Sequence, residues 1–212
     1  MPLAALSVLE PRKTPLQARA AVTVEAICEA TIQVLLSHGA DRLTTTRVAD
    51  RAGVSVGTLY QYYPNKQSLL FAVMEDHMEK VAAAVEAACG RACNRPLSEM
   101  VKQVVEVFVD IKMERADISV ALYQVAAEIG GPALVKKATQ RMRNALEAML
   151  QTALDVESPP DRLAIDTMIA AMSGAMRSLL ESRPSPLTVR KQREQLVLLC
   201  QSYMNASTRR RP

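Results

Sequence analysis

The sequence is poor in aromatic residues, with no tryptophan, two phenylalanines and five tyrosines among its 212 residues. Glycine is also scarce, with seven residues, and no stretch alternates apolar and polar positions as a half-buried strand does. A fold rich in sheet is therefore disfavoured. Alanine and leucine occur throughout the chain and favour helices, so the composition predicts an all-α protein.

Long uncharged apolar runs are missing as well. No stretch reaches the roughly 18 apolar residues that a membrane span needs, and the first residues lack the pattern of a secretion signal. The four cysteines form no CxxC pair, which fits a reducing compartment. We therefore expect a soluble, cytoplasmic protein with no membrane partner. Cys89 and Cys93 lie one helical turn apart; sheltered thiols are the favoured interpretation, and a redox pair is the alternative.

Catalytic patterns are also lacking. Neither of the two histidines, His38 and His77, has paired carboxylates, a nucleophile elbow or a phosphate-binding loop nearby. We expect His38 to interact with the carboxyl end of a helix and His77 to lie at the surface. The sequence predicts no enzyme, no metal site and no cofactor.

Two helix starts follow each other closely in the first third of the chain. Thr44 and Ser55 are both good N-cap residues, and each is flanked by the apolar pair of a hydrophobic staple. Between them lies a tight turn in which Gly53 is free to adopt a positive φ. Two short capped helices at this spacing predict a helix-turn-helix, in which the second helix enters the major groove of DNA. An ordinary helical hairpin in a core is the alternative.

The second of these helices, residues 55–62, begins with small side chains. Gly57 costs a helix about 1 kcal/mol relative to alanine, so a reason other than helix stability favours it. Tyr60, Gln61 and Tyr62 are able to reach phosphates, and Gln61 is also suited to adenine. Tyr63 is expected to pack inward. The scarce tyrosines thus divide into two that face DNA and one that holds the core.

A lysine stands at the start of the following helix. Asn65 is its expected cap, which places Lys66 where a cation opposes the helix dipole. A phosphate at this position removes the conflict, because the ammonium and the free backbone N–H groups then share one anion. A solvated surface lysine is the alternative. From residue 12 to residue 66, seven basic residues stand against four acidic ones, which agrees with a DNA partner.

The run "LTTTRVADRAGVSVGTLYQYYPNKQSLL", residues 43–70, resembles the TetR-type transcriptional regulators. Tyr62 stands where many members have histidine, and Tyr63 where phenylalanine is common. The resemblance covers roughly residues 18–75 and implies a three-helix DNA-binding domain followed by a larger helical domain that binds a ligand and dimerises. By position, the residues implied to face double-stranded DNA are Thr45, Thr46, Val56, Gly57, Thr58, Tyr60, Gln61, Tyr62 and Lys66.

Proline-containing breaks divide the chain into four predicted regions: a flexible arm (1–13), a helix-turn-helix domain (14–65), a helical ligand-binding and dimerisation domain (66–207) and a basic tail (208–212). A connecting helix is expected over residues 66–92 and three more helices over 97–154. Flexible methionines suit an apolar pocket, although most are core filler. The pocket residues predicted for a small, largely apolar inducer are Met100, Phe108, Met113, Tyr123, Gln124, Gln140, Met142, Asn144 and Met149.

The last two helices predict a dimer interface. Residues 161–182 carry one methionine-rich face and a second strip of small residues, which permits close helix approach. Residues 188–204 have a wider apolar stripe than one core needs, although a single broad core is the alternative. The predicted interface residues are Ala171, Gly174, Ala175, Ser178, Leu196, Leu199 and Tyr203. The sequence therefore favours a homodimeric, inducer-responsive repressor on a palindromic operator, with a helical adaptor that binds proteins and not DNA as the alternative.

Overall fold

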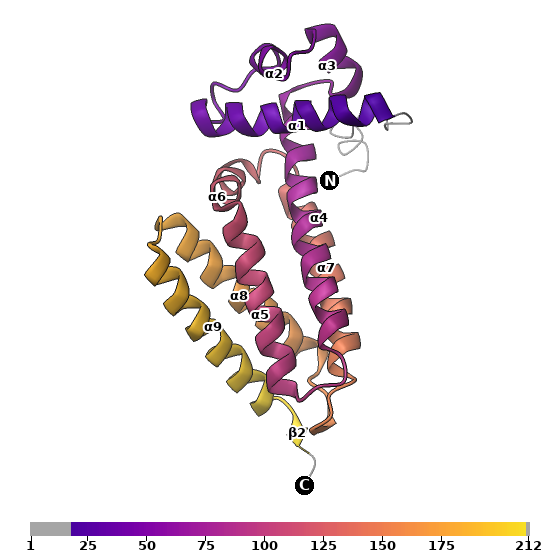
Figure 1. Ribbon diagram of the computed structural model, residues 1–212, viewed down its shortest axis with the longest axis vertical. Coiled ribbons are helices and arrows are strands. Elements are labelled where there is room, and N and C mark those ends of the chain that lie inside the picture. Colours follow the sequence, from indigo (N-terminus) through magenta and orange to yellow (C-terminus); the bar gives the residue numbers. More distant parts are fainter. Residues whose placement is uncertain (1–17, 211–212) are drawn as a thin grey trace. The chain divides into compact units, whose positions relative to one another are not determined.

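The computed structural model describes residues 18–210, and within this range it contains nine helices and one two-stranded sheet (Figure 1). The predicted all-α class is confirmed. The predicted arm, residues 1–13, lies outside the described residues. Part of the predicted basic tail forms a short strand that pairs antiparallel with β1. The elements are α1 (Ala18–His38), α2 (Thr45–Ala52), α3 (Val56–Tyr62), α4 (Lys66–Ala92), α5 (Leu97–Glu114), α6 (Ala116–Val125), α7 (Gly131–Leu150), β1 (Val156–Ser158), α8 (Arg162–Glu181), α9 (Pro186–Ala206) and β2 (Arg209–Arg210).

The chain divides into two compact units. The first unit comprises the described residues up to 78 together with residues 117–135, and the second comprises residues 79–116 and the chain from 136 onwards. Helices α4 and α7 each contribute to both units. The first unit thus extends beyond the predicted helix-turn-helix region and includes α6, which comes much later in the chain.

The core of the first unit joins α6 to the helix-turn-helix. Leu59 of α3 and Tyr63 are buried in the same cluster as Ile118 and Leu122 of α6. The Tyr63 hydroxyl lies 3.4 Å from the Cys28 sulfur, and burial raises the pKa of Tyr63 above its usual value. The prediction that Tyr63 packs inward is therefore confirmed.

His77 also belongs to this interior, so its predicted surface position is wrong. Its side chain is buried on α4, and its Nε2 lies 2.9 Å from the hydroxyl of the buried Ser119 on α6. An imidazole has an apolar body and two polar nitrogens, so it is readily buried where a hydroxyl provides a partner. The packing of α6 supplies that partner, and α6 is distant from His77 in sequence.

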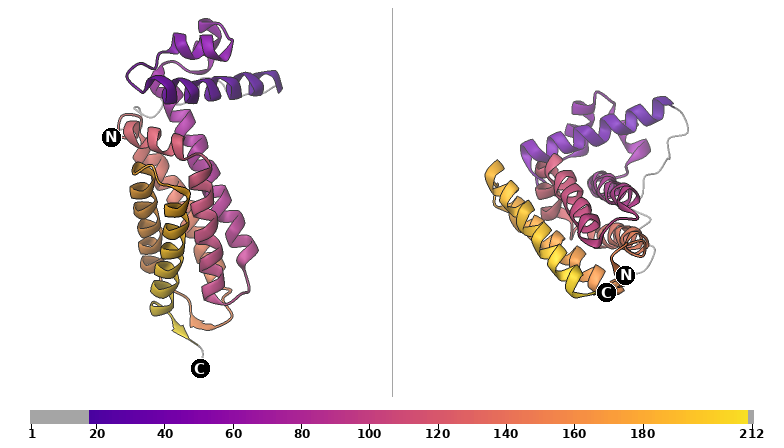
Figure 2. Two further views of the ribbon diagram at one scale, coloured as in Figure 1. Left: turned by 60° about the vertical axis from the view of Figure 1, so that its left-hand side comes forward. Right: turned by 60° about the horizontal axis from the view of Figure 1, so that its bottom comes forward.

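The second unit is organised around α5, which packs against α8 and α9 (Figure 2). The methionine-rich face of α8 is buried, as are Leu196, Cys200 and Met204, which recur every fourth residue along α9. Ion pairs connect further helices of this unit: Arg141 of α7 binds Glu86 of α4 through two nitrogens, at 2.6 and 2.8 Å. Burial raises the pKa of Cys89 to about 12, which makes this thiol a poor nucleophile and disfavours the redox pair.

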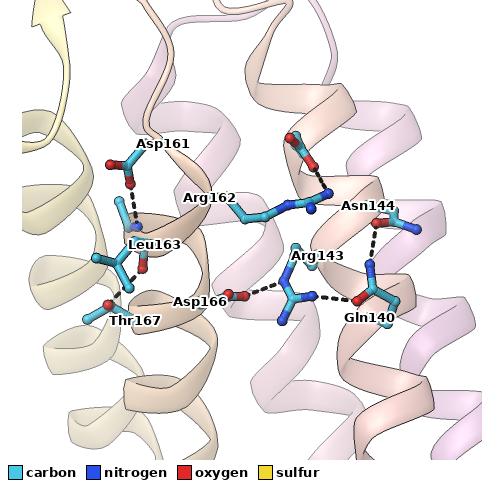
Figure 3. Close-up of polar contacts among 10 residues, drawn as sticks. Gln140, Arg143, Asn144, Asp161, Arg162, Leu163, Asp166 and Thr167 are labelled. Atoms are coloured by element: carbon cyan, nitrogen blue, oxygen red, sulfur yellow. Dashed lines mark hydrogen bonds and ion pairs between the residues drawn. The ribbon is translucent and has the colours of Figure 1, made fainter.

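Figure 3 shows how α7 and α8 are joined at the surface of the second unit. Arg143 of α7 pairs with Asp166 of α8, and Arg162 of α8 donates to Glu147 of α7 at 3.1 Å. Asp161 caps α8 by accepting from the Ala164 N–H at 2.7 Å. These contacts fix the register of α8, whose opposite side carries the candidate dimer residues considered below.

Two helices, Ala20–His38 and Arg162–Glu181, are long and apolar enough to cross a membrane by length and composition alone. In α1, Ile27, Val34 and Leu35 are buried in the core of the first unit. In α8, Met168 and Met176 are buried in the second unit. Protein packing thus accounts for part of their hydropathy, with 33% of the apolar window in α1 and 44% of that in α8 buried.

Candidate DNA-binding site

Helices α2 and α3 begin at the two predicted caps. Thr44 has an extended backbone and its hydroxyl accepts from the Arg47 N–H at 3.3 Å, while the Ser55 hydroxyl accepts from the Thr58 N–H at 2.9 Å. Gly53 ends α2 with φ at 67°. A side chain is strained at this φ, so glycine sets the turn that separates the two helices. The predicted helix-turn-helix is confirmed in its caps, its turn and its spacing.

The first turn of α3 is open above Gly57. A Cβ built on this residue would lie 3.7 Å from the Ser55 hydroxyl oxygen, and its φ is not positive. Nothing in the packing of the first unit therefore requires glycine here. Because glycine lowers helix stability, the open position fits a surface that another molecule approaches closely.

Tyr60 joins the two helices at their exposed side. Its side chain is 43% exposed, and its hydroxyl lies 3.2 Å from the Thr45 hydroxyl at the start of α2. Thr46 and Gln61 are exposed as well. This contact holds the tyrosine ring beside the first turn of α2.

Tyr62 and Val56 are placed differently from the prediction. Both are half-buried and pack against the core of the first unit. Of the two tyrosines expected to face outward, only Tyr60 is exposed. Val56 and Tyr62 lie three residues before and after Leu59, the buried residue of this seven-residue helix, so helical spacing places both toward the core.

Lys66 is the first residue of α4, as predicted, and Asn65 caps the helix by accepting from the Ser68 N–H at 2.8 Å. The Lys66 ammonium donates to the Ala40 carbonyl at 2.9 Å. An ammonium carries three donors, so one carbonyl partner leaves others for a phosphate. The carbonyl also holds the cation close to the start of α4.

Sequence reasoning did not single out the arginines of α2. Arg47 is exposed, and its guanidinium donates to the Arg42 carbonyl at 2.6 Å. Arg51 is exposed and donates to the Gln33 amide oxygen on α1. The local excess of basic residues was the available signal, but it does not say which arginines share a surface with α3.

Two family models match the chain. The model described as "Tetracyclin repressor-like, C-terminal domain" matches residues 96–204, and the model described as "Bacterial regulatory proteins, tetR family" matches residues 27–73. This chain belongs to the TetR family of transcriptional regulators. The second match contains all of α2 and α3, so the family model and the geometry identify the same DNA-binding element.

Individual relatives resemble the chain only in part. The HTH-type transcriptional repressor KstR of Mycolicibacterium smegmatis is 36% identical over 60 residues, which is 28% of this chain and 29% of that protein. KstR of Mycobacterium tuberculosis is 35% identical over 60 residues, 28% of this chain and 27% of its own length. The chain thus matches less than a third of the length of these curated relatives.

Solved structures of TetR-family members share the fold over nearly the whole chain. A regulator from Mesorhizobium loti has a TM-score of 0.72 at 15% identity, covering 90% of this chain and 98% of that one. The fatty acid degradation regulator FadR from Bacillus halodurans has a TM-score of 0.66 at 18% identity, covering 87% and 96%. At these identities the likeness establishes the fold and not the ligand.

The predicted pocket residues of this TetR-family chain are divided between the two units. Tyr123 and Gln124 lie on α6 in the first unit, and the other seven belong to the second unit. Gln124, Gln140 and Asn144 are exposed, and the latter two hydrogen-bond each other at 2.8 Å along α7 (Figure 3). Their predicted role as groups that orient an enclosed inducer is therefore wrong. The buried members of the set are Met100, Phe108, Met142 and Met149, while Met113 is half-buried.

One groove in the second unit has a volume of about 350 Å³, and none of the predicted pocket residues lines it. It lies between α5 and α9, and both acidic and basic side chains surround it together with the exposed Leu198. Its lining residues are Lys102, Glu106, Arg193, Glu194, Val197, Leu198 and Gln201.

The predicted dimer residues divide into two groups. On α8, Gly174 and Ser178 are exposed and Ala171 and Ala175 half-buried, and none of them belongs to the buried methionine face. On α9, Leu199 is 51% exposed and Tyr203 half-buried. Leu196 is 1% exposed and packs within the chain's own core, so its assignment to a dimer interface is wrong.

Proposed function

We propose that this TetR-family protein is a cytoplasmic, homodimeric repressor that binds a palindromic operator and is released by a small, largely apolar inducer. The observation that carries the proposal is the helix pair α2 and α3, joined by the contact between Thr45 and Tyr60 and open above Gly57. The curated relatives are named repressors, which favours repression over activation.

In this proposal α3 enters the major groove of the operator. Its small first turn, around Gly57, approaches the base edges, and Gln61 reads adenine through its amide. Tyr60 and Lys66 bind phosphates on either side of the groove, and Arg47 adds a further phosphate contact. The exposed Thr46, at the start of α2, contributes to the sequence preference.

Dimerisation is proposed to use α8 and α9. The exposed apolar side chains Leu163 and Leu199, 73% and 51% accessible, gain burial when a second copy covers them. Gly174 has no atom within 4 Å of an added Cβ, so the strip around it is open to a closely packed partner helix. Two helices from each chain then form a four-helix interface around a two-fold axis, which matches the symmetry of a palindrome.

Helix α4 is proposed to transmit inducer binding to the DNA-binding helices. This helix begins at Lys66, in the first unit, and ends at Ala92, in the second, so it contributes residues to both units. A ligand that prefers one tilt of α4 changes the separation of the two recognition helices. By linkage, operator DNA weakens inducer binding by the same factor that inducer weakens operator binding. Calorimetry of an identified inducer with and without operator measures the factor by which operator weakens inducer binding; equal affinities contradict this mechanism.

The helical adaptor and the repressor differ in how they respond to salt. A protein that neutralises phosphates loses affinity for duplex DNA as salt rises, with a slope set by the number of contacts. We expect fluorescence anisotropy with a labelled duplex to show this slope, and to show a weaker one when Arg47 is replaced by alanine. If the protein does not bind the duplex even at low salt, the adaptor is favoured.

A further inference from the structure

Helix α5 buries a lysine on an otherwise apolar face. The buried positions of α5 follow a helical period, and each of them is apolar except the last, Lys112. Phe108, one turn earlier on this face, is 2% exposed and Lys112 itself 6%. Among residues 20–208, Lys112 is the one lysine, arginine, aspartate or glutamate whose side chain is buried.

A buried ammonium destabilises a helical body to the extent that its partners do not offset the loss of hydration. Burial lowers the pKa of Lys112 to about 8, so the side chain remains mostly protonated at pH 7. A methionine of similar volume fits an apolar face without this cost. The last turn of α5 does attract a cation through the helix dipole, but an exposed lysine satisfies the dipole without desolvation.

Lys112 is therefore the one position on this face where the residue type disagrees with its apolar surroundings. Such disagreements concentrate at functional sites. The position lies within the segment that matches the TetR-family C-terminal domain. Lys112 already takes part in an interaction within the chain. Since an ammonium has three donors, a ligand oxygen is able to share the cation with that interaction.

We propose that Lys112 is the anion-binding group of the ligand site, and that the ligand is an apolar molecule carrying a carboxylate. The apolar face around Phe108 and Val109 receives the hydrocarbon body, and the ammonium binds the carboxylate in surroundings of low dielectric, where a charge pair is stronger than in water. This inference rests on the proposed inducer response for its biological meaning. Lys112 then provides the polar recognition that the sequence had assigned to the exposed amides of Gln124, Gln140 and Asn144.

The test compares matched ligand pairs on three proteins. The probes are decanoate, cyclohexaneacetate and 4-phenylbutyrate, each paired with its own neutral primary amide, and calorimetry measures their affinity. The proteins are the wild type, Lys112→Met and the control Lys102→Met, which removes an exposed lysine from the same helix. We expect the wild type and Lys102→Met to bind at least one carboxylate about tenfold or more tightly than its amide, and Lys112→Met to lose that preference.

A measurement on the wild type alone covers the case in which Lys112→Met fails to fold. In protein labelled with ¹⁵N-lysine, the Nζ resonance of Lys112 should shift on addition of a preferred carboxylate and stay in place with its amide. Equal affinity of the wild type for every carboxylate and its amide overturns the inference, as does a preference that persists in Lys112→Met.

Operator binding separates this inference from the proposed function. A carboxylate that binds through Lys112 without weakening operator binding supports the anion site and contradicts the inducer response. An operator complex that forms normally in a protein with no carboxylate preference supports DNA binding and overturns the anion site.

Discussion

Replacing Gly57 with alanine should make the protein more stable and a weaker DNA binder. An added Cβ has room, since its nearest neighbour is the Ser55 hydroxyl oxygen at 3.7 Å. Alanine is more favourable than glycine in a helix by about 0.5–1 kcal/mol, and part of this gain comes from the less flexible unfolded chain. Because Gly57 lies in the first turn of a seven-residue helix, we expect the lower end of this range.

The same methyl group should interfere with the operator. If the first turn of α3 approaches the base edges closely, an extra methyl forces a shift that costs about 1–3 kcal/mol, as in other close-packed contacts. This corresponds to roughly 5- to 150-fold weaker binding. Urea unfolding measures the stability, and fluorescence anisotropy with an operator duplex measures the affinity.

Gly90→Ala is the matched control. Gly90 is an exposed glycine in the last turn of α4, with no atom within 4 Å of an added Cβ. Its replacement should stabilise the protein by about 0.5–1 kcal/mol, as expected for Gly57→Ala, and leave operator affinity unchanged. If Gly57→Ala binds the operator as tightly as Gly90→Ala, Gly57 does not serve close approach to DNA.

Three further predictions concern other parts of the molecule. Lys66→Ala should weaken binding to all duplexes alike and flatten the plot of log K against log salt by about one unit; an unchanged slope in anisotropy titrations would argue against the phosphate contact. Gly174→Arg should sediment as a folded monomer at micromolar concentration, and a folded dimer would contradict the α8 interface. Because the pKa of Lys112 falls from 10.5 to about 8 on folding, the folded state loses this proton first. The wild type should therefore gain stability relative to Lys112→Met as pH rises from 8 to 10.5, by at most about 3 kcal/mol, and urea unfolding showing a constant difference would refute the desolvation.

The DNA-binding element was predictable because its signals are local. Caps at Thr44, Ser55 and Asn65 act on backbone groups within one helical turn, and Gly53 determines the conformation of its own residue. The family pattern covers the same stretch. Sequence reasoning therefore located the starts of α2, α3 and α4 correctly.

Orientation within a helix was less predictable, because it depends on partners distant in sequence. Apolar residues surround much of α9, and packing against α5 decides that Leu196 faces inward while Leu199 is exposed. His77 is buried because α6 packs beside it and offers Ser119. The amide of Gln140 donates to the amide oxygen of Asn144 along α7, so the two side chains are partners of each other. Their residue types alone did not distinguish this pairing from polar groups that face a pocket.

Selection of bound duplexes from a random pool tests whether a two-fold dimer reads its operator through α3. The wild type should enrich one motif arranged as an inverted repeat, with half-sites about one helical turn or a multiple apart, because a two-fold dimer presents two copies of α3. Gln61→Ala should enrich a motif altered at the position that Gln61 reads, with the half-site spacing kept. Two outcomes would contradict a dimeric repressor that reads its operator through α3. One is that no motif is recovered. The other is that both proteins recover the same motif and that this motif has no inverted symmetry.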